Sequence, residues 1–312
     1  MTDLILHHYE ISPFSEKVRR ILAWKGLSWL AVRAPAVMPK PDLIALTGGY
    51  RKIPVLQIHN HVYCDSALIA RVLEQRSVEP TLYPSPIAEV VAEWADGPLF
   101  EAATTLFMRP TRFDDLVRLL TQHELATMME DRKALRKDAL RNAAAPRSIR
   151  AQLDVYLARL DATLAAQPFL LGRAPSIADF SAHHSLWLIE RVAPEALAAF
   201  AHMRAWMERI AAFPDAHSEP LSSEDALRIS RESDPSWTPP EPFADTMGLA
   251  LEQAVIVRTN DYGRDPVRGA LVSSTANELV LRREDERAGT VYVHFPRLGF
   301  EIVPDKGESI RA

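Results

Sequence analysis

The stretch HHYEISPFSEKVRRIL, residues 7–22, joins an apolar strand to an amphipathic helix through a sharp break. Pro13 suits the first position of the helix, because its missing N–H would be unpaired there in any case. Ser12 therefore lies at or near the N-cap, with its hydroxyl beside exposed backbone N–H groups. This hydroxyl is either an ordinary helix cap or a group placed to serve a ligand. The residues that share one helical face are Phe14, Val18, Ile21 and Leu22.

Residues 1–80 continue as short strands and helices in the order βαβαββα. The first βαβ unit should be a right-handed crossover with a parallel pair of strands. The last hairpin, around residues 59–61, adds antiparallel strands. Strands are expected at 4–8, 29–33, 55–58 and 62–64, and helices before Gly26, at 42–46 and around 68–73.

The composition is that of an ordinary soluble globular chain, with 47% of the 312 residues hydrophobic and 25% charged. The formal net charge of −5 argues against nucleic acid as a partner. Cys64 is the single cysteine, so no intramolecular disulfide can form and the cytoplasm is the natural compartment. The N-terminal residues do not resemble a secretory signal, and no apolar run reaches the roughly 18 residues of a membrane span.

Three short motifs follow one another in the N-terminal region: Ser12-Pro13-Phe14-Ser15, Lys52-Ile53-Pro54-Val55 and Asp65-Ser66. In this order and at these spacings they resemble the thioredoxin-like domain of soluble glutathione transferases. The resemblance covers about residues 1–232. It implies an α/β thioredoxin-like domain at 1–80 and an all-α helical transferase domain at 86–232. It also implies glutathione as co-substrate, with no metal.

Asp65-Ser66 opens a helix, where free N–H groups and the positive end of the helix dipole attract an anion. In the resembling family, the pair at this place holds the γ-glutamyl end of glutathione. Asp65 can pair with the ligand's ammonium group, and Ser66 can serve its carboxylate. The alternative is a helix cap without a ligand, because such caps are common.

The resemblance implies a cis bond before Pro54, although most X-Pro bonds are trans. A cis bond would turn the Ile53 backbone outward to pair with the cysteinyl part of glutathione, like an added strand. Lys40 lies where relatives often bind the glycyl carboxylate, and Lys52 precedes the Ile-Pro pair. The residues assigned to glutathione are Phe14, Lys40, Lys52, Ile53, Pro54, Asp65 and Ser66.

Ser12 is the catalytic candidate, with Tyr9 in reserve because some transferases use a tyrosine near the end of the first strand. A free thiol has a pKa of about 8.5, and lowering it by about 2 units corresponds to roughly 2.7 kcal/mol. A hydroxyl donor at a helix N-terminus can supply this stabilisation of the thiolate. Omega-like relatives carry cysteine where Ser12 stands, so mixed-disulfide chemistry is not favoured.

The rest of the chain is helical up to about residue 210 and then changes character. Ser176 and Asp179 have capping-box spacing and are expected to be structural. The charged insertion at 107–150 is either a solvated helix or a lid over the acceptor pocket. Residues 247–312 follow a proline-rich connector and are predicted to form a small β-rich module. Candidate aromatic residues for the acceptor pocket are Trp94, Phe100, Phe107 and Phe113.

The sequence therefore predicts a homodimeric enzyme that conjugates glutathione to a small hydrophobic electrophile, without nucleic-acid or membrane partners. Glutathione-dependent dehalogenation or isomerisation on the same site is an alternative. A further alternative is a non-catalytic glutathione- or ligand-binding protein whose β tail recruits a partner. The β module is expected to rest on the helical domain. Truncation after about Trp237 is then expected to leave a dimer that still binds glutathione.

Overall fold

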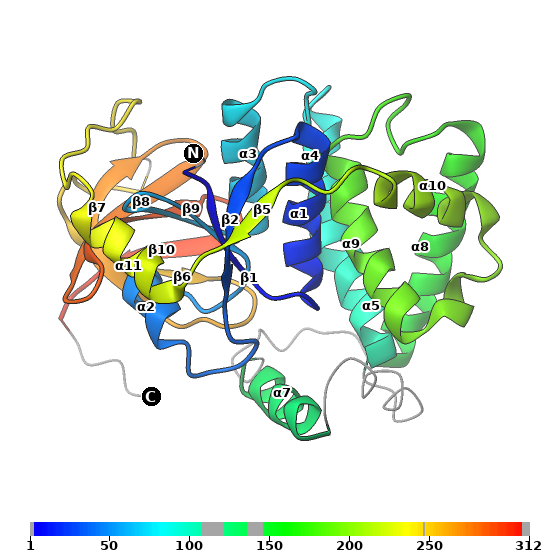
Figure 1. Ribbon diagram of the computed structural model, residues 1–312, viewed down its shortest axis with the longest axis horizontal. Helices are drawn as coiled ribbons and strands as arrows, with labels where there is room; N and C mark the ends of the chain where they lie inside the picture. The colour runs from blue at the N-terminus through cyan, green and yellow to red at the C-terminus, as the bar shows by residue number, and fades with distance from the viewer. Residues whose placement is uncertain (1–2, 108–121, 136–145, 246, 308–312) are drawn as a thin grey trace.

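The computed structural model describes residues 3–107, 122–135, 146–245 and 247–307. Its helices gather at one end of the molecule and its strands at the other, with the N-terminal domain between them (Figure 1). Helix α1 lies against the helical end, whereas the sheet continues away from it into the C-terminal strands. The N-terminal domain is thus enclosed on both sides by later parts of the chain.

The N-terminal domain has the predicted order of elements. Strands β1 and β2 pair in parallel, whereas β1 with β3 and β3 with β4 pair antiparallel. Ser12 caps the first helix, and Gly26 ends it in the left-handed conformation that favours glycine. The elements are β1 (Ile5–His8), α1 (Pro13–Lys25), β2 (Trp29–Arg33), α2 (Pro41–Thr47), β3 (Val55–Ile58), β4 (His61–Cys64) and α3 (Ser66–Arg76).

The helical domain packs around α9, most of whose side chains are buried. The predicted capping box is present, because Ser176 and Asp179 exchange side-chain-to-backbone hydrogen bonds. Asp179 also accepts from the Trp206 indole at 2.9 Å, which confirms its structural role. The elements are α4 (Ile87–Trp94), the π-helical turn η1 (Ala95–Leu99), α5 (Phe100–Phe107), α7 (Gln122–Leu135), α8 (Pro146–Ala166), α9 (Ile177–Val192), the 3₁₀ turn η3 (Pro194–Leu197) and α10 (Ala201–Ala211).

After α10 the chain returns to the N-terminal sheet. Strand β5 (Ser218–Pro220) pairs in parallel with β2, and α11 (Ser223–Glu232) contacts α2 and β9. The Gln57 amide, at the centre of β3, donates to the Ala226 carbonyl of α11 at 2.8 Å. Packing between the two ends of the chain therefore begins before residue 232.

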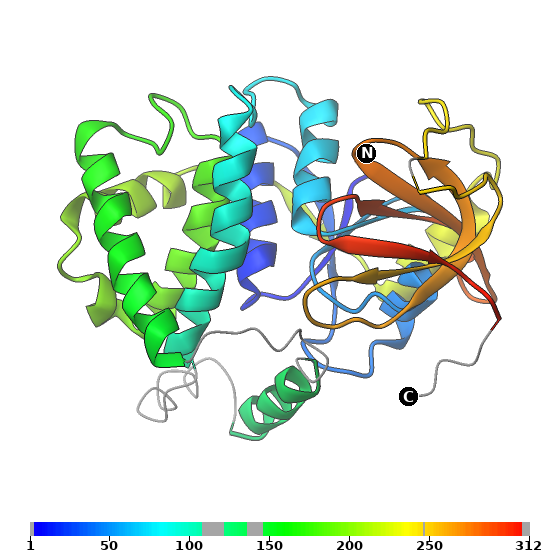
Figure 2. The same ribbon diagram turned by 180° about the vertical axis from the view of Figure 1, so that it is seen from behind.

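The C-terminal module extends the N-terminal sheet. Strand β9 pairs in parallel with β4, giving the continuous order β10-β6-β7-β8-β9-β4-β3-β1-β2-β5. Figure 2 shows these strands beside the N-terminal domain, away from the helical end. The predicted β-rich fold is confirmed, and β10 is an additional strand. The module consists of β6 (Ala254–Thr259), β7 (Val267–Ser274), β8 (Glu278–Asp285), β9 (Gly289–Pro296) and β10 (Phe300–Pro304).

The module rests mainly on the N-terminal domain, and it also contacts α11, the last helix of the predicted helical domain. One hydrophobic core joins it to the N-terminal domain, because β9 covers the otherwise free edge of β4 and the two parts bury apolar side chains together. From the N-terminal domain this core includes Leu43, Leu46, Tyr50, Val55 and Val62. From the module it includes Val255, Val257, Leu271, Leu281, Val291, Val293 and Phe295.

The proline-rich connector, expected to have few buried contacts, is also attached to the sheet. The Trp237 ring packs edge-on against His61 at 5.2 Å between ring centroids. Tyr292 donates its hydroxyl to the Pro235 carbonyl at 2.6 Å, and the Asn60 amide donates to the Asp234 carbonyl at 3.2 Å. The connector is therefore part of the packed structure.

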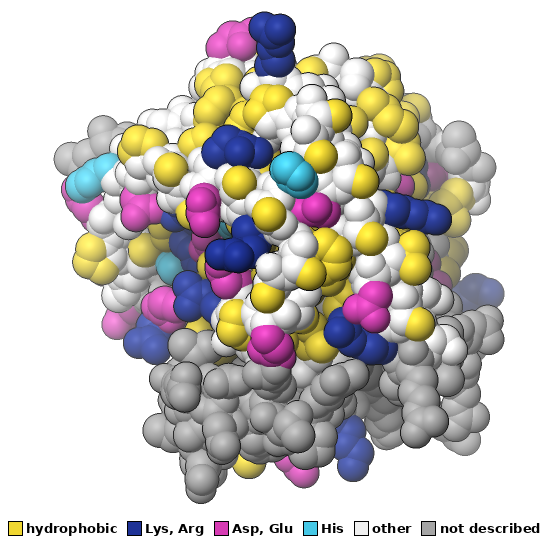
Figure 3. Space-filling view, turned by 90° about the vertical axis from the view of Figure 1, so that its right-hand side faces the viewer, with side chains coloured by type: hydrophobic (Ala, Val, Ile, Leu, Met, Phe, Trp, Pro, Cys, Tyr) yellow, Lys and Arg dark blue, Asp and Glu magenta, His cyan; other side chains and the backbone are white. Residues whose placement is uncertain are grey.

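The surface at the helical end has mixed character. Figure 3 shows acidic, basic and hydrophobic side chains interspersed on this face. Among the residues that the structure describes, no helix is both long enough and apolar enough to cross a membrane.

Candidate active site

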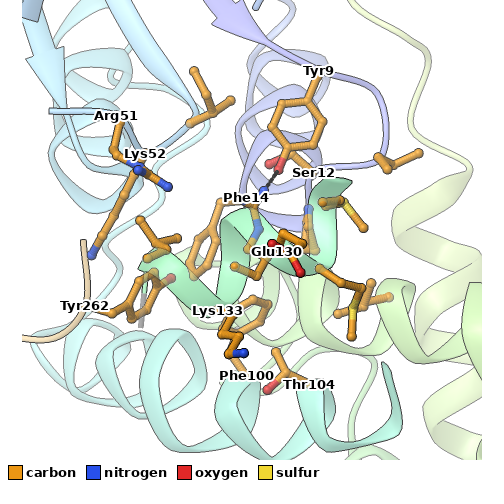
Figure 4. Close-up of a pocket in the computed structure, with 18 of the residues that line it drawn as sticks. Tyr9, Ser12, Phe14, Arg51, Lys52, Phe100, Thr104, Glu130, Lys133 and Tyr262 are labelled. Atoms are coloured by element: carbon orange, nitrogen blue, oxygen red, sulfur yellow. Dashed lines mark hydrogen bonds between the residues drawn. The ribbon is translucent and has the colours of Figure 1, made fainter. Parts of the chain in front are cut away.

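A pocket of about 720 Å³ lies where the N-terminal domain, the helical domain, α7 and the C-terminal module meet. Figure 4 shows polar and charged side chains around its rim and apolar ones within it. It brings together six of the predicted site residues, namely Tyr9, Ser12, Phe14, Lys40, Lys52 and Ile53. Its other lining residues are Ile11, Pro13, Arg51, Phe100, Thr104, Ala126, Met128, Met129, Glu130, Arg132, Lys133, Leu135, Leu188 and Tyr262.

Ser12 borders the pocket at the N-terminus of α1. Its Oγ accepts a hydrogen bond from the Ser15 N–H at 3.2 Å, which is the expected N-cap interaction. Its own N–H donates to the Tyr9 carbonyl at 3.2 Å. Because the cap uses a lone pair of Oγ, the hydroxyl proton can be donated to a group in the pocket.

Tyr9, the reserve candidate, is held by α7. Its hydroxyl oxygen accepts from the Arg132 guanidinium at 3.0 Å, and the same guanidinium donates to the Ala36 carbonyl at 3.2 Å. Tyr9 and Ser12 thus reach the same pocket from one turn of chain (Figure 4). Tyr9 differs from Ser12 in having a cationic partner beside its oxygen.

The Ile53–Pro54 peptide bond is cis, as the resemblance implies. Ile53 lines the pocket, whereas Pro54 is not among the lining residues that the structure describes. Ile53 lies two residues before β3, whose first residue, Val55, pairs with His7 near the end of β1. This is the geometry that an extended peptide ligand needs for backbone pairing.

Lys40, Arg51 and Lys52 are among the cationic side chains that line the pocket, together with Arg132 and Lys133. Lys40 is 4% exposed, and its ammonium donates to the Arg51 carbonyl at 3.0 Å. Burial, followed by repulsion from Arg132, lowers the pKa of Lys40 to about 7. Arg51 pairs with Asp131 of α7 at 2.9 Å.

Asp65 and Ser66 form the N-terminus of α3 but are not among the described residues that line the pocket. Asp65 has a φ of 80° and accepts from the Ala67 N–H at 2.8 Å, so it is an N-cap. Burial raises the pKa of its carboxyl. The Ser66 hydroxyl accepts from the Lys17 ammonium at 3.2 Å.

Sequence analysis missed the buried cluster behind Ser66. Lys17 is fully buried on α1 and pairs with Asp96 at 2.6 Å. Asp96 also accepts from the Ser181 hydroxyl at 3.2 Å and contacts the His184 ring nitrogen at 3.0 Å. Burial opposes ionisation of Asp96, yet Lys17 and His184 hold its pKa below its ordinary value. The available signal was a lysine beside Val18 on the apolar side of α1.

The acceptor side of the pocket is formed partly by residues that the sequence indicated. Phe100 lines it, as expected. Trp94 instead packs edge-on against Tyr156 at 5.2 Å. The Phe107 side chain and Phe113 lie outside the described residues. Helix α7, within the charged insertion, adds Met128 and Met129 to the apolar wall.

The C-terminal module reaches the pocket through Tyr262, which sequence analysis did not identify. The pocket is therefore lined in part by residues far beyond position 80. No local pattern around Tyr262 points to a ligand, because its position depends on how the module docks. Among the residues that the structure describes, no cluster of His, Cys, Asp or Glu could hold a metal ion.

Comparison with known proteins agrees with this geometry. The family model for the glutathione S-transferase N-terminal domain matches residues 6–81, and that for the C-terminal domain matches residues 100–214. A solved GST-like protein from Pseudomonas syringae is 37% identical, with a TM-score of 0.80. The match covers 98% of this chain and all of that one, so it extends through the C-terminal module.

Two other relatives match a smaller part of the chain. FtsZ-localized protein A of Caulobacter vibrioides is 27% identical over 212 residues, covering 67% of this chain and 87% of that protein. A glutathione S-transferase from Rhodospirillum rubrum is 22% identical with a TM-score of 0.52, covering 68% of this chain and 89% of that one, and supports the fold alone. The matched domains and the full-length relative together show that the chain belongs to the glutathione S-transferase superfamily.

Proposed function

We propose that the protein binds glutathione in this pocket and transfers its sulfur to a small hydrophobic electrophile. The observation that carries the proposal is the meeting of Ser12, at the N-cap of α1, with Ile53, before the cis proline, in one pocket. The Ile53 backbone would pair with the cysteinyl part of the ligand. The sulfur would then lie near the Ser12 hydroxyl and the positive end of α1.

Each end of glutathione has a matching group in the protein. Lys40 would attract the glycyl carboxylate, and Asp65 and Ser66 would bind the γ-glutamyl end at the start of α3. The Lys17 ammonium behind Ser66 donates to the Ser66 hydroxyl and would orient it at that end. Phe14, with the apolar residues of α5 and α7, would hold the electrophile and exclude water.

In the reaction, the Ser12 hydroxyl donates a hydrogen bond to the thiolate and so lowers the pKa of the bound thiol. The thiolate attacks the electrophilic carbon, a carbon–sulfur bond forms, and the leaving group departs with the bonding electrons. Positioning of the two reactants supplies the rest of the rate enhancement. Dehalogenation or isomerisation would use the same thiolate with a different acceptor.

Replacement of Ser12 tests this proposal. Ser12→Ala should lower turnover with 1-chloro-2,4-dinitrobenzene about 10- to 100-fold and raise the pKa of bound glutathione by about 1–2 units. Affinity for glutathione should change less than about threefold, because the hydroxyl touches only the sulfur. Ultraviolet absorbance of the thiolate, followed against pH, measures the pKa of the bound thiol.

A matched control separates activation from capping. Ser222 caps α11 by accepting from the Asp225 N–H at 3.0 Å, in the same way as Ser12 caps α1. Ser222→Ala should therefore cost similar stability while leaving the thiol pKa unchanged. Unaltered turnover in Ser12→Ala would assign the sulfur to Tyr9, and Tyr9→Phe would then be the inactive variant.

A second candidate is a glutathione- or ligand-binding protein without turnover, whose β module recruits a partner. The similarity to FtsZ-localized protein A favours it, because the name of that relative associates it with another protein. A bound glutathione that titrates like the free thiol would support this candidate. We further propose that the protein is a cytoplasmic homodimer, since its single cysteine is buried and two-fold pairing is the commonest assembly.

A further inference from the structure

The β6–β7 connection carries the C-terminal module to the pocket. The Thr259 hydroxyl lies 2.9 Å from the Tyr262 carbonyl and 3.2 Å from the Gly263 carbonyl, which folds the connection back on itself. Arg264 pairs with Glu301 of β10 at 2.6 Å and fixes its far side. The turn is thus held by the module's own strands.

The connection fits closely against two other parts of the protein. The Gly263 N–H donates to the Leu135 carbonyl at the end of α7, at 2.9 Å. A Cβ on Gly263 would lie 2.7 Å from a Leu135 methyl carbon, and one on Gly49 would lie 2.6 Å from the Pro266 carbonyl oxygen. Both glycines also have positive φ. The close contact of the β6–β7 connection with α7 therefore depends on Gly263, and its contact with the segment after α2 depends on Gly49.

Within this connection, two side chains hold Lys52. The Lys52 ammonium lies 2.6 and 2.9 Å from the two carboxylate oxygens of Asp261. It also lies 4.0 Å from the centre of the Tyr262 ring, in a cation–π contact. Figure 4 shows Lys52 and Tyr262 side by side, across the pocket from Tyr9. Both residues line the pocket.

The end of the pocket at which Lys52 lies determines which part of a ligand it meets. Glutathione has one carboxylate on its γ-glutamyl residue and one on its glycine. Asp65 and Ser66 lie at the γ-glutamyl end of the proposed site, so the glycyl carboxylate points to the opposite end. Lys40, assigned to the glycyl carboxylate, donates to the carbonyl of Arg51, the residue directly before Lys52.

We propose that the C-terminal module completes the glutathione site: Asp261 and Tyr262 are positioning residues that hold the Lys52 ammonium toward the glycyl carboxylate. This inference rests on the proposed function, because it takes glutathione as the ligand. The module is then a component of the binding site in the same chain. Its strands β6 and β7 fix the connection that carries these two residues.

The test compares glutathione with γ-glutamylcysteine, which lacks the glycine, by titration calorimetry. Tyr262→Ala should weaken glutathione binding about tenfold and γ-glutamylcysteine binding less than about twofold, the size expected for one charge-assisted hydrogen bond. Tyr262→Phe keeps the ring and should bind like the wild type. Leu298→Ala, at an exposed turn of the same module, is the control for general effects.

A double variant tests whether Tyr262 acts through Lys52. Lys52→Met combined with Tyr262→Ala should bind glutathione no more weakly than Lys52→Met alone, because the second change then removes nothing further. If the losses of glutathione affinity in the two single variants added up in the double variant, Tyr262 would not act by positioning Lys52. Thermal melts of each variant establish that it is folded.

Other outcomes overturn the inference in distinguishable ways. If Tyr262→Ala lost the same affinity for glutathione and for γ-glutamylcysteine, Tyr262 would have only a general structural role. If Tyr262→Ala lost more affinity for S-hexylglutathione than for glutathione, Tyr262 would instead contact the electrophile on the acceptor side of the pocket. A wild-type protein that binds neither peptide would overturn the proposed function together with this inference. If Tyr262→Ala is selective while Ser12→Ala leaves the thiol pKa unchanged, the inference stands and the thiolate mechanism fails.

Discussion

Lys40 shows how burial at the pocket makes ligand binding depend on protons. Its ammonium is nearly enclosed by protein and donates a hydrogen bond to the Arg51 carbonyl, 3.0 Å away. Burial and then Arg132 lower its pKa to about 7. A carboxylate placed beside Lys40 would favour the charged amine and raise this pKa again. Binding of an anion and protonation of Lys40 are therefore linked.

This linkage predicts proton uptake when a carboxylate ligand binds. Below about pH 7 Lys40 is already charged, and binding takes up no proton; above it, the free protein holds a neutral amine that must be protonated. Affinity should thus fall as pH rises above about 7. Calorimetry in buffers of different ionisation enthalpy measures the uptake, with S-methylglutathione as ligand so that no thiol titrates. Lys40→Met should abolish it, and Lys306→Met should not.

Absence of proton uptake at about pH 8 in the wild type would show that Lys40 does not meet the ligand's carboxylate. The predicted assignment of Lys40 to the glycyl end would then have to pass to Arg51 or Lys52.

Residues whose role depends on nearby sequence were predictable, and those whose role depends on distant contacts were not. Ser12 and the Ser176–Asp179 box were identified because a cap is defined within four positions of the chain. Cys64, at the end of β4, is fully buried. Tyr262 could not be identified, because Lys52 is its neighbour only after β9 has paired with β4.

At the scale of elements, polar contacts attach α7 to the N-terminal domain. Figure 1 shows it apart from the bundle of α5, α8 and α9, beside the loop before α2. One carboxylate oxygen of Asp131 lies 2.9 Å from the Arg51 guanidinium and 3.3 Å from the Met38 N–H. The other accepts from Arg132 at 2.7 Å. Asp131 thus connects α7 to two segments of the N-terminal domain.

We therefore expect Asp131→Ala to loosen α7 without unfolding the protein. Amide hydrogen exchange in α7 should accelerate, and the KM for a hydrophobic electrophile should rise about 3- to 10-fold, because a partly buried charge partner is lost. Asp154→Ala is the matched control, since Asp154 pairs with Arg150 at 3.3 Å on α8 but is 63% exposed. Unchanged exchange in α7 would mean that its apolar contacts alone hold it in place.

The elements themselves could be predicted more fully than their arrangement. Strands β2 and β3 have the predicted bounds, and the faces of β9 alternate, with Val291, Val293 and Phe295 in the shared core. Strand β10 was missed because it is a short apolar segment among polar residues. The parallel pairing of β9 with β4 could not be predicted, because nothing local encodes a partner more than 200 positions away.

At the scale of the whole molecule, the sheet leaves few routes to self-association. Strand β4 is paired on both sides, and the outer strands β10 and β5 both end in proline, which discourages further pairing. Helix α4 differs, because Ile87 and Val90 are 52% and 60% exposed one turn apart. An apolar helical face of this kind is suited to an interface between two copies.

The proposed homodimer can be tested on this face. Light scattering should give a dimer at micromolar concentration, and Val90→Glu should shift it to a monomer, because a buried unpaired charge opposes association. Val155→Glu, at an exposed position of α8, should leave the mass unchanged. A monomeric wild-type protein would contradict the proposed homodimer. A dimer that Val90→Glu does not disrupt would show that the interface lies away from α4.

The shared core reverses the outcome expected for truncation after Trp237. Removal of β6–β10 would expose Val55, Val62 and Cys64, all fully buried in the intact chain, and leave β4 with an unpaired edge. Burying one large apolar side chain contributes about 1.5–3 kcal/mol, whereas a whole domain is stable by only about 5–15 kcal/mol. The truncated chain should therefore lack cooperative thermal unfolding and bind a hydrophobic dye. Leu298→Ala, at an exposed turn of the intact module, should leave the melting temperature unchanged. A soluble truncated protein with a cooperative melt and wild-type affinity for glutathione would contradict both the shared core and the role of Tyr262, since each requires the module.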